Sequence, residues 1–177
     1  MASTRILSII GRKNAGKTTL TVALVSELAR RGRRVMTIKH SHHPADVDRP
    51  GSDSWRHFHE GRAERSLIAA PDLRVLFERS ADDYDPVALA RRYLADADIV
   101  LAEGYKRAPI PKIEIFRPSV DPTPLFDAAS PDAHLWVAIV TDDLDFQSPC
   151  KVVRFQDTMW LQLLASLAIE CAQAIDA

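Results

Sequence analysis

Residues 5–18 read RILSIIGRKNAGKT, and this stretch decides the fold class. Its first six residues form a short, mainly apolar run with β-branched side chains, which is typical of a buried strand. Residues 11–18 then match the pattern G-x-x-x-x-G-K-[ST] at every required position. Residues 17–31 carry leucines and a valine at helical spacing, and Gly32 is placed to end that helix. A strand, a glycine-bearing turn and a helix in this order predict a loop that binds the phosphates of a nucleotide.

The residue types of this loop suit phosphate binding. Glycines let consecutive backbone N–H groups wrap an anion where a side chain would collide with it. The helix that follows directs its partly positive N-terminus at the same phosphates. Lys17 is expected to act as a fixed cation at the β- and γ-phosphates, and the Thr18 hydroxyl is expected to bind Mg²⁺. The residues predicted to contact the nucleotide here are Gly11, Lys13, Asn14, Ala15, Gly16, Lys17, Thr18 and Thr19.

Outside this loop, segments typical of strands and helices alternate along the chain. The expected strands are residues 34–40, 98–102, 112–116 and 135–140. Three further helices are expected: residues 52–60, a helix capped by Asp85 with Pro86 at its first position, and a final helix that begins at Asp157. Residues 66–70 and 73–77 flank Pro71 and Asp72, which predicts two extended segments joined by a tight turn. The alternation predicts an α/β fold of the P-loop nucleoside triphosphatase type, with a mostly parallel sheet and helices on both faces. We expect one nucleotide-binding domain over residues 1–177.

Composition limits the function classes. The chain has 177 residues, 46% hydrophobic and 27% charged, which fits one domain with an adequate core and excludes disorder. No run reaches the roughly 18–20 uncharged apolar residues of a membrane span. Cys150 and Cys171 are too few for a disulfide framework, so we expect a reduced, cytoplasmic setting. The net charge of −1 argues against general nucleic-acid binding, yet residues 1–40 carry nine lysines and arginines against one acid, which suits a polyanion such as a nucleotide.

Acidic residues after the other predicted strands are candidates for metal binding and catalysis. Glu103 directly follows the apolar run IVLA and is predicted to support Mg²⁺ together with Thr18. Asp46, in the polar segment after residue 40, is predicted to help bind Mg²⁺ or to orient an attacking water. Asp46 and Lys17 are therefore the candidate catalytic residues. Asp48 is an alternative to Asp46, and a simple polar turn is an alternative for both.

Three histidines, His40, His42 and His43, come at the end of the strand predicted at 34–40. Parallel strands bring their carboxyl ends to one sheet edge, so His40 is expected to contact the nucleotide if this strand lies beside that of residues 5–10. The three side chains are also candidates for a transition-metal site. Their spacing lacks the H-x₃-H pattern and a nearby cysteine, which favours loop or phosphate contacts over a dedicated metal centre.

Asp142 and Asp143 follow the strand predicted at 135–140 and are candidates for reading the base. A carboxylate at such a strand end can accept hydrogen bonds from N1–H and the exocyclic amine of guanine, which adenine does not offer. The usual guanine-reading pattern, [NT]-K-x-D, is incomplete here because Asp142 follows Thr141 where a lysine is expected. We predict GTP as the nucleotide, with Asp142 or Asp143 as the base reader.

Four further segments resemble the MobB family, the small GTP-binding proteins of molybdopterin-guanine dinucleotide biosynthesis. These segments are TIKHSHH at 37–43 followed by Asp46 and Asp48, RPGSDSWR at 49–56, AEGYK at 102–106 and IPKIE at 110–114. Many families share the phosphate-binding loop, whereas these segments in this order are far more specific. The resemblance extends from residue 5 to residue 140 and is weakest over residues 121–134 and in the final helix.

The resemblance implies a homodimeric protein that binds GTP and Mg²⁺, hydrolyses GTP slowly and assists the nucleotidyltransferase MobA, which joins GMP to molybdopterin. On this basis, residues 11–18 would bind the triphosphate and Glu103 would support Mg²⁺. The segment from His40 to Asp48 would face the γ-phosphate or the pterin. The extended pair around Pro71 and Asp72 would be a candidate dimer element, with an ordinary edge hairpin as the alternative.

Other functions stay open at this point. A small-molecule P-loop kinase is one alternative, although Asn14 stands where many such kinases have a further glycine, and no distinct arginine-rich lid segment is evident. A nickel-chaperone GTPase that uses His40, His42 and His43 is another, and an adapter that binds GTP without significant catalysis is a third. Slow hydrolysis is the expectation, because the sequence offers no clear water-positioning glutamine and does not single out an arginine finger.

Overall fold

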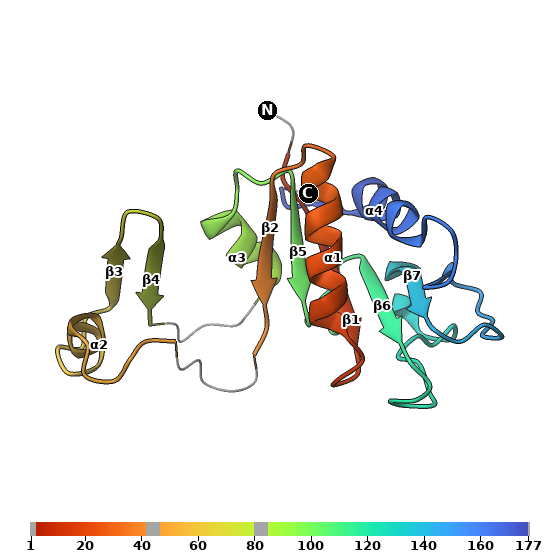
Figure 1. Cartoon of the computed structure of the whole chain (residues 1–177), viewed down its shortest axis with the longest axis horizontal. Helices are drawn as coiled ribbons and strands as arrows, with labels where there is room; N and C mark the ends of the chain where they lie inside the picture. Colours follow the sequence, from red (N-terminus) through yellow and green to blue (C-terminus); the bar gives the residue numbers. More distant parts are fainter. Residues whose placement is uncertain (1–2, 42–46, 80–84, 177) are drawn as a thin grey trace. The chain divides into compact units, whose positions relative to one another are not determined.

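The computed structural model describes residues 3–41, 47–79 and 85–176 (Figure 1). The chain forms two compact units, Met1–His40 with Tyr84–Ala177, and Ser41–Asp83. The larger unit contains the predicted phosphate-binding loop and every predicted strand except the extended pair around Pro71. The expectation of one domain over residues 1–177 stays a prediction, because two compact units of one chain can belong to one domain.

A seven-stranded sheet forms the centre of the larger unit (Figure 1). Its path runs β2-β5-β1-β6-β7-β8, and all neighbours along this path are parallel. The bounds are β1 Arg5–Gly11, β2 Val35–Lys39, β5 Ile99–Glu103, β6 Lys112–Phe116, β7 Trp136–Thr141 and β8 Val152–Arg154. The last strand, β9 (Gln173–Ala174), pairs antiparallel with the start of β1. The predicted α/β fold with a mostly parallel sheet is confirmed.

The central position of β5 separates β1 from β2, so the first two strands of the chain are not neighbours. Burial gives the reason: all five residues of β5 are buried, whereas β2 mixes half-buried and exposed side chains and forms the sheet edge. In the ladder, Lys39 pairs with Glu103 and Glu103 pairs with Ile9. The carboxyl ends of the three strands therefore still share one edge of the sheet.

Helices cover both faces of this sheet, as predicted. On one face, α1 (Lys17–Arg30) and α4 (Trp160–Cys171) contact each other, and α3 (Pro86–Tyr93) packs on the other face. The side chains of β5 alternate accordingly, because Leu101 joins the core cluster with α1 and α4, and Val100 joins the cluster with α3. Among the residues that the structure describes, no helix is long and apolar enough to cross a membrane.

The start of α4 and two short strands differ from the sequence prediction. α4 begins at Trp160 and not at Asp157. The Asp157 carboxylate instead accepts a hydrogen bond from the backbone N–H of Arg154 at 2.8 Å, and Met159 adopts a left-handed backbone with a φ of 61°, which breaks the helix before Trp160. The strands β8 and β9 were not predicted, because two or three residues carry too little periodicity to be recognised.

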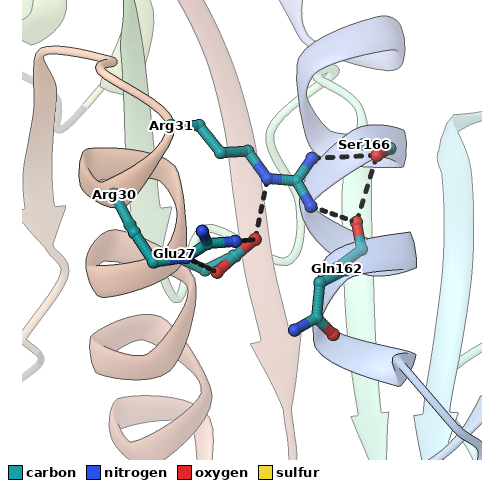
Figure 2. Close-up of polar contacts among 5 residues, drawn as sticks. All are labelled: Glu27, Arg30, Arg31, Gln162 and Ser166. Atoms are coloured by element: carbon teal, nitrogen blue, oxygen red, sulfur yellow. Dashed lines mark hydrogen bonds and ion pairs between the residues drawn. The ribbon is translucent and has the colours of Figure 1, made fainter.

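A polar network joins the C-terminal end of α1 to α4 (Figure 2). Glu27 accepts hydrogen bonds from Arg30 at 2.9 Å and from Arg31 at 2.8 Å, and Arg31 also donates to the Gln162 carbonyl at 2.7 Å and to Ser166 Oγ at 2.9 Å. The two arginines lower the pKa of Glu27 to about 2, so its carboxylate stays ionised at neutral pH. Charge-assisted hydrogen bonds thus hold the two helices together in addition to apolar packing.

The smaller unit consists of α2 (Asp53–His59) and a two-stranded antiparallel sheet, β3 (Arg65–Ala69) and β4 (Arg74–Glu78). Ser52 caps α2 by accepting a hydrogen bond from the backbone N–H of Trp55 at 3.2 Å. Phe58 of α2 contacts Phe77 of β4, with ring centroids 6.0 Å apart. The predicted helix and the predicted hairpin are both present.

Candidate nucleotide-binding site

The loop between β1 and α1 approaches β6 closely. A Cβ added to Gly11 would lie 2.6 Å from the carbonyl oxygen of Ile115, so only glycine fits there. Gly16 has a φ of 102°, in the left-handed region, and caps α1 without a side chain. A glycine cap leaves the first amides of α1 to bind an anion, which is what the sequence predicts for phosphate.

Lys17 folds back over the loop. Its Nζ donates hydrogen bonds to the carbonyl oxygens of the first two loop residues, Gly11 at 3.2 Å and Arg12 at 2.9 Å. The pKa of Lys17 is lowered from its ordinary value, mainly because burial disfavours the charged ammonium group. The Glu103 carboxylate opposes this shift, and the neighbouring Lys39 and Lys106 add to it. The cations of this edge repel one another, so an anion bound among them would be stabilised.

Thr18 and Glu103 meet at the carboxyl edge of the sheet. Thr18 Oγ1 donates a hydrogen bond to Glu103 Oε1 at 2.9 Å, and Lys39 Nζ lies 4.0 Å from the same oxygen. Hydroxyl and carboxylate oxygens are ligands that suit Mg²⁺, so this donor set fits the metal role predicted for the two residues. The third predicted metal ligand, Asp46, lies outside the described residues.

His40 lies at the same edge, directly after β2. Its backbone N–H donates to the Glu103 carbonyl at 3.0 Å, and its ring centroid lies 5.0 Å from that of Tyr105. His42 and His43 lie outside the described residues. Within the part of the chain that the structure describes, no group of three or more histidine, cysteine or acidic side chains is arranged to hold a metal ion.

Asp142 and Asp143 follow β7, but they make different contacts. Asp142 Oδ2 accepts a hydrogen bond from Arg117 at 2.9 Å. Asp143 belongs to a local turn, in which its backbone N–H donates to Thr141 Oγ1 at 3.1 Å and its Oδ1 accepts from the backbone N–H of Asp145 at 2.9 Å. Of the two candidate base readers, Asp142 is connected through Arg117 to the loop between β1 and α1.

Arg117 is a residue of this edge that the sequence prediction did not select. Its Nε donates to the carbonyl oxygen of Ala15, inside the loop, at 3.0 Å. A signal was present in the sequence, because Arg117 directly follows the strand predicted at 112–116. Its contact partners could not be identified without knowing that β6 lies beside β1.

The remaining predicted contacts lie in the loop and the first turn of α1. Ala15 is buried, whereas Lys13, Asn14 and Thr19 are exposed. Asn14 adopts a left-handed backbone with a φ of 66°, a conformation that asparagine tolerates better than most residues. The structure therefore brings the loop, His40, Glu103 and Asp142 to a single edge of the sheet.

The parallel sheet and the loop between β1 and α1 define an α/β protein of the P-loop class. Comparison with known families narrows this class. The profile described as "Molybdopterin guanine dinucleotide synthesis protein B" (MobB) matches residues 6–142, and the chain belongs to this family.

Two curated relatives match part of the chain. Both are named molybdopterin-guanine dinucleotide biosynthesis adapter protein. The one from Haemophilus influenzae is 42% identical over 118 residues, which cover 63% of this chain and 63% of the relative. The one from Escherichia coli is 36% identical over 115 residues, which cover 63% of this chain and 65% of the relative. The chain thus spans somewhat less than two thirds of the length of each.

Solved structures share the fold over almost the whole chain. A crystal structure of molybdopterin-guanine biosynthesis protein B superposes with a TM-score of 0.69 at 25% identity, covering 93% of this chain and 98% of that one. The Bacillus subtilis MobB structure gives a TM-score of 0.66 at 20% identity, with 93% and 98% coverage. The second likeness concerns the fold alone.

Proposed function

We propose that this chain binds GTP and Mg²⁺ and acts as an accessory protein in molybdopterin-guanine dinucleotide synthesis, with weak GTP hydrolysis. The relatives that it matches are named as adapter proteins of this synthesis. The observation that carries the proposal is the 2.9 Å contact between Thr18 and Glu103, because it joins the phosphate-binding loop to a strand-end carboxylate. The proposed partners are a nucleotidyltransferase of the MobA type and molybdopterin.

Each residue of the site has a chemical role in this proposal. Gly16 and the first amides of α1 would hold the phosphates, and Lys17 would exchange the loop carbonyls for the β- and γ-phosphate oxygens. Mg²⁺, when bound, supplies further charge neutralisation, and Thr18 and Glu103 are the residues that would hold it. Asp46 is our candidate for orienting the attacking water. Fast hydrolysis also needs a transition-state cation, so slow turnover is expected unless a partner supplies one.

Calorimetric titration of GTP and ATP, each with and without Mg²⁺ and molybdopterin, tests this proposal. We expect tighter binding of GTP than of ATP. The substitution of the true base reader, Asp142→Asn or Asp143→Asn, should narrow this preference by about tenfold, because a hydrogen bond to a charged group contributes about 1.5–3 kcal/mol. Asp132→Asn, on the exposed 3₁₀ helix Pro131–Leu135, is the matched control.

The outcomes of this titration separate the parts of the proposal. If neither aspartate variant changes the preference for GTP over ATP, neither residue reads the base. If the wild-type protein binds GTP and ATP with equal affinity, the assignment of guanine as the base is wrong. Absence of any nucleotide binding would overturn the function itself. Phosphate release, measured alone and with the nucleotidyltransferase, distinguishes an accessory GTPase from an adapter that binds GTP without catalysis.

We also propose that the protein is a homodimer and that the β3–β4 hairpin contributes to its interface. Leu67 and Leu76 pair across the two strands and are 63% and 44% exposed, and Leu73, next to the turn, is 58% exposed. A two-stranded hairpin is marginally stable by itself. Adjacent exposed leucines on such a hairpin are typical of a surface that another protein chain covers.

The variant Leu67→Glu is expected to shift the protein from dimer to monomer in sedimentation velocity, because it replaces one of the exposed leucines of the hairpin with a charged side chain. Leu144→Glu, at a leucine of the larger unit that is 62% exposed, is the control and should leave the dimer intact. A dimer that persists in Leu67→Glu would exclude the hairpin from the interface. A monomeric wild-type protein would contradict the dimer proposal.

A further inference from the structure

Arg117 connects the phosphate-binding loop to the end of β7. Its Nε donates to the Ala15 carbonyl at 3.0 Å, and its terminal nitrogen donates to Asp142 Oδ2 at 2.9 Å. Its guanidinium carbon also lies 5.0 Å from the centroid of the Phe155 ring. Three partners hold this side chain although it is 37% exposed, so its position is determined by contacts and not by burial alone.

The strand order explains why these groups meet. β6 lies beside β1, with Ile115 paired to Gly11, so the residue after β6 emerges next to the loop. β7 lies on the other side of β6, with Phe116 paired to Thr141. Arg117 and Asp142 are the next residues of these two strands, which places the guanidinium between the loop and the Asp142 carboxylate.

The contact with Ala15 also affects the loop backbone. Among the described residues no peptide bond is cis, so the Ala15–Gly16 peptide is trans and planar. In such a peptide the N–H points opposite to the C=O. By holding the Ala15 carbonyl, Arg117 therefore directs the Gly16 N–H away from itself, and Gly16 is the N-cap residue of α1. The orientation of this amide is one that a bound phosphate would depend on.

We propose that Arg117 is a positioning residue that couples the phosphate-binding loop to the Asp142 carboxylate, so that phosphate affinity and base preference depend on each other. The inference rests on the proposed function and adds to it a residue that links phosphate binding to base recognition. Arginine suits this role because its planar, rigid fork donates to two acceptors at once, whereas lysine is a single point charge.

Inorganic tripolyphosphate provides the sharpest test, because it has phosphates but no base. Its affinity would be measured by displacement of a fluorescent GTP analogue from the full-length chain, alongside GTP and ATP. We expect Arg117→Gln to weaken the binding of tripolyphosphate and of GTP by about tenfold each, because the Ala15 carbonyl loses the donor that holds it and the orientation of the Gly16 N–H is no longer fixed. Arg117→Lys should recover only part of this loss.

The distinguishing result concerns Asp142. If it acts on the loop through Arg117, Asp142→Asn should weaken tripolyphosphate by about threefold, an effect that direct base reading does not produce. In the Arg117→Gln background, Asp142→Asn should cause almost no further loss of tripolyphosphate affinity, because the contact between residue 117 and Asp142 is already absent. Arg34→Gln, which breaks the pair with Asp96 at 2.8 Å, is the matched control and should change neither affinity.

Thermal unfolding of each variant without nucleotide establishes that it is folded. Unchanged tripolyphosphate affinity in folded Arg117→Gln, additive effects in the double variant, or a wild-type protein from which tripolyphosphate cannot displace the analogue would each overturn the inference. A wild-type protein that binds no GTP would instead overturn the proposed function. The two failures are therefore distinguishable.

Discussion

The variant Lys17→Ala is expected to bind GTP at least about 100-fold more weakly than the wild-type protein. In the proposed complex, Lys17 Nζ donates to both the β- and the γ-phosphate. Two hydrogen bonds to charged groups contribute about 1.5–3 kcal/mol each, and about 1.4 kcal/mol corresponds to a factor of ten in affinity. Isothermal titration of GTP into the variant, with Mg²⁺ present, measures this loss.

Two comparisons make the Lys17 result interpretable. Lys151→Ala, at an exposed lysine beside β8, removes the same charge at a distance from the loop and should leave the affinity unchanged. Because Lys17 also donates to the Gly11 and Arg12 carbonyls, Lys17→Ala must be shown to unfold at a temperature close to that of the wild-type. GTP affinity that is retained in a folded Lys17→Ala would move the nucleotide to another place on the protein.

The sequence predicts the strand, turn and helix around residues 11–18 well because the signals for them are local. Gly11, Gly16, Lys17 and Thr18 owe their positions to one strand, one turn and one helix, all contiguous in the chain. The contact of Thr18 with Glu103 was also foreseeable in outline, because an acid that ends an apolar strand reaches the carboxyl edge of a parallel sheet. Where one element fixes the geometry, pattern and spacing are sufficient.

Prediction was weaker where strand order decides the outcome. The neighbours of β1 cannot be read from the chain, since β5 and β6 come more than 80 residues after β1 in sequence. The contacts of Arg117 depend on that order and were missed for this reason. The difference between Asp142 and Asp143 depends on it as well, because only the structure shows that Asp142 pairs with a residue after β6.

Buried charges in β6 also required the structure. Lys112 and Glu114 are each only 1% exposed, although residues of these types are rarely buried unless they are paired. Lys112 Nζ donates to the carbonyl oxygens of Lys106 at 3.2 Å and Ala108 at 2.6 Å, and so holds the segment that follows Glu103. Burial lowers the pKa of Lys112 and raises the pKa of Glu114.

The Glu114 carboxylate organises the long connection between β6 and β7. It accepts hydrogen bonds from the backbone N–H groups of Leu125 at 2.5 Å and Phe126 at 2.9 Å, and from the indole N–H of Trp136 at 2.9 Å. The same connection carries Asp121, which pairs with Arg12 of the loop between β1 and α1 at 3.0 Å. A side chain in the core of the sheet thereby supports a segment that contacts the candidate site.

Glu114→Ala is therefore expected to reduce the free energy of unfolding by about 3 kcal/mol or more. The substitution leaves three donors without their acceptor, and a buried donor that loses its partner costs about 1–3 kcal/mol, part of which water can recover. In a chain of this length such a loss corresponds to about 10 °C in the unfolding midpoint. Urea titration and calorimetry measure the two quantities.

The conservative variant separates lost hydrogen bonds from lost volume. Glu114→Gln keeps the shape of the side chain, yet its amide nitrogen would face at least one of the three donors, so we expect it to be less stable than wild-type and more stable than Glu114→Ala.

Asp96→Ala, which removes an exposed ion-pair partner of Arg34, is the control and should reduce the free energy of unfolding by at most about 1 kcal/mol. A Glu114→Ala variant as stable as Asp96→Ala would mean that the carboxylate does not hold this connection. If the connection does support the phosphate-binding loop, Glu114→Ala should also weaken GTP binding at a temperature where it is still folded, because the pair between Arg12 and Asp121 depends on the same segment.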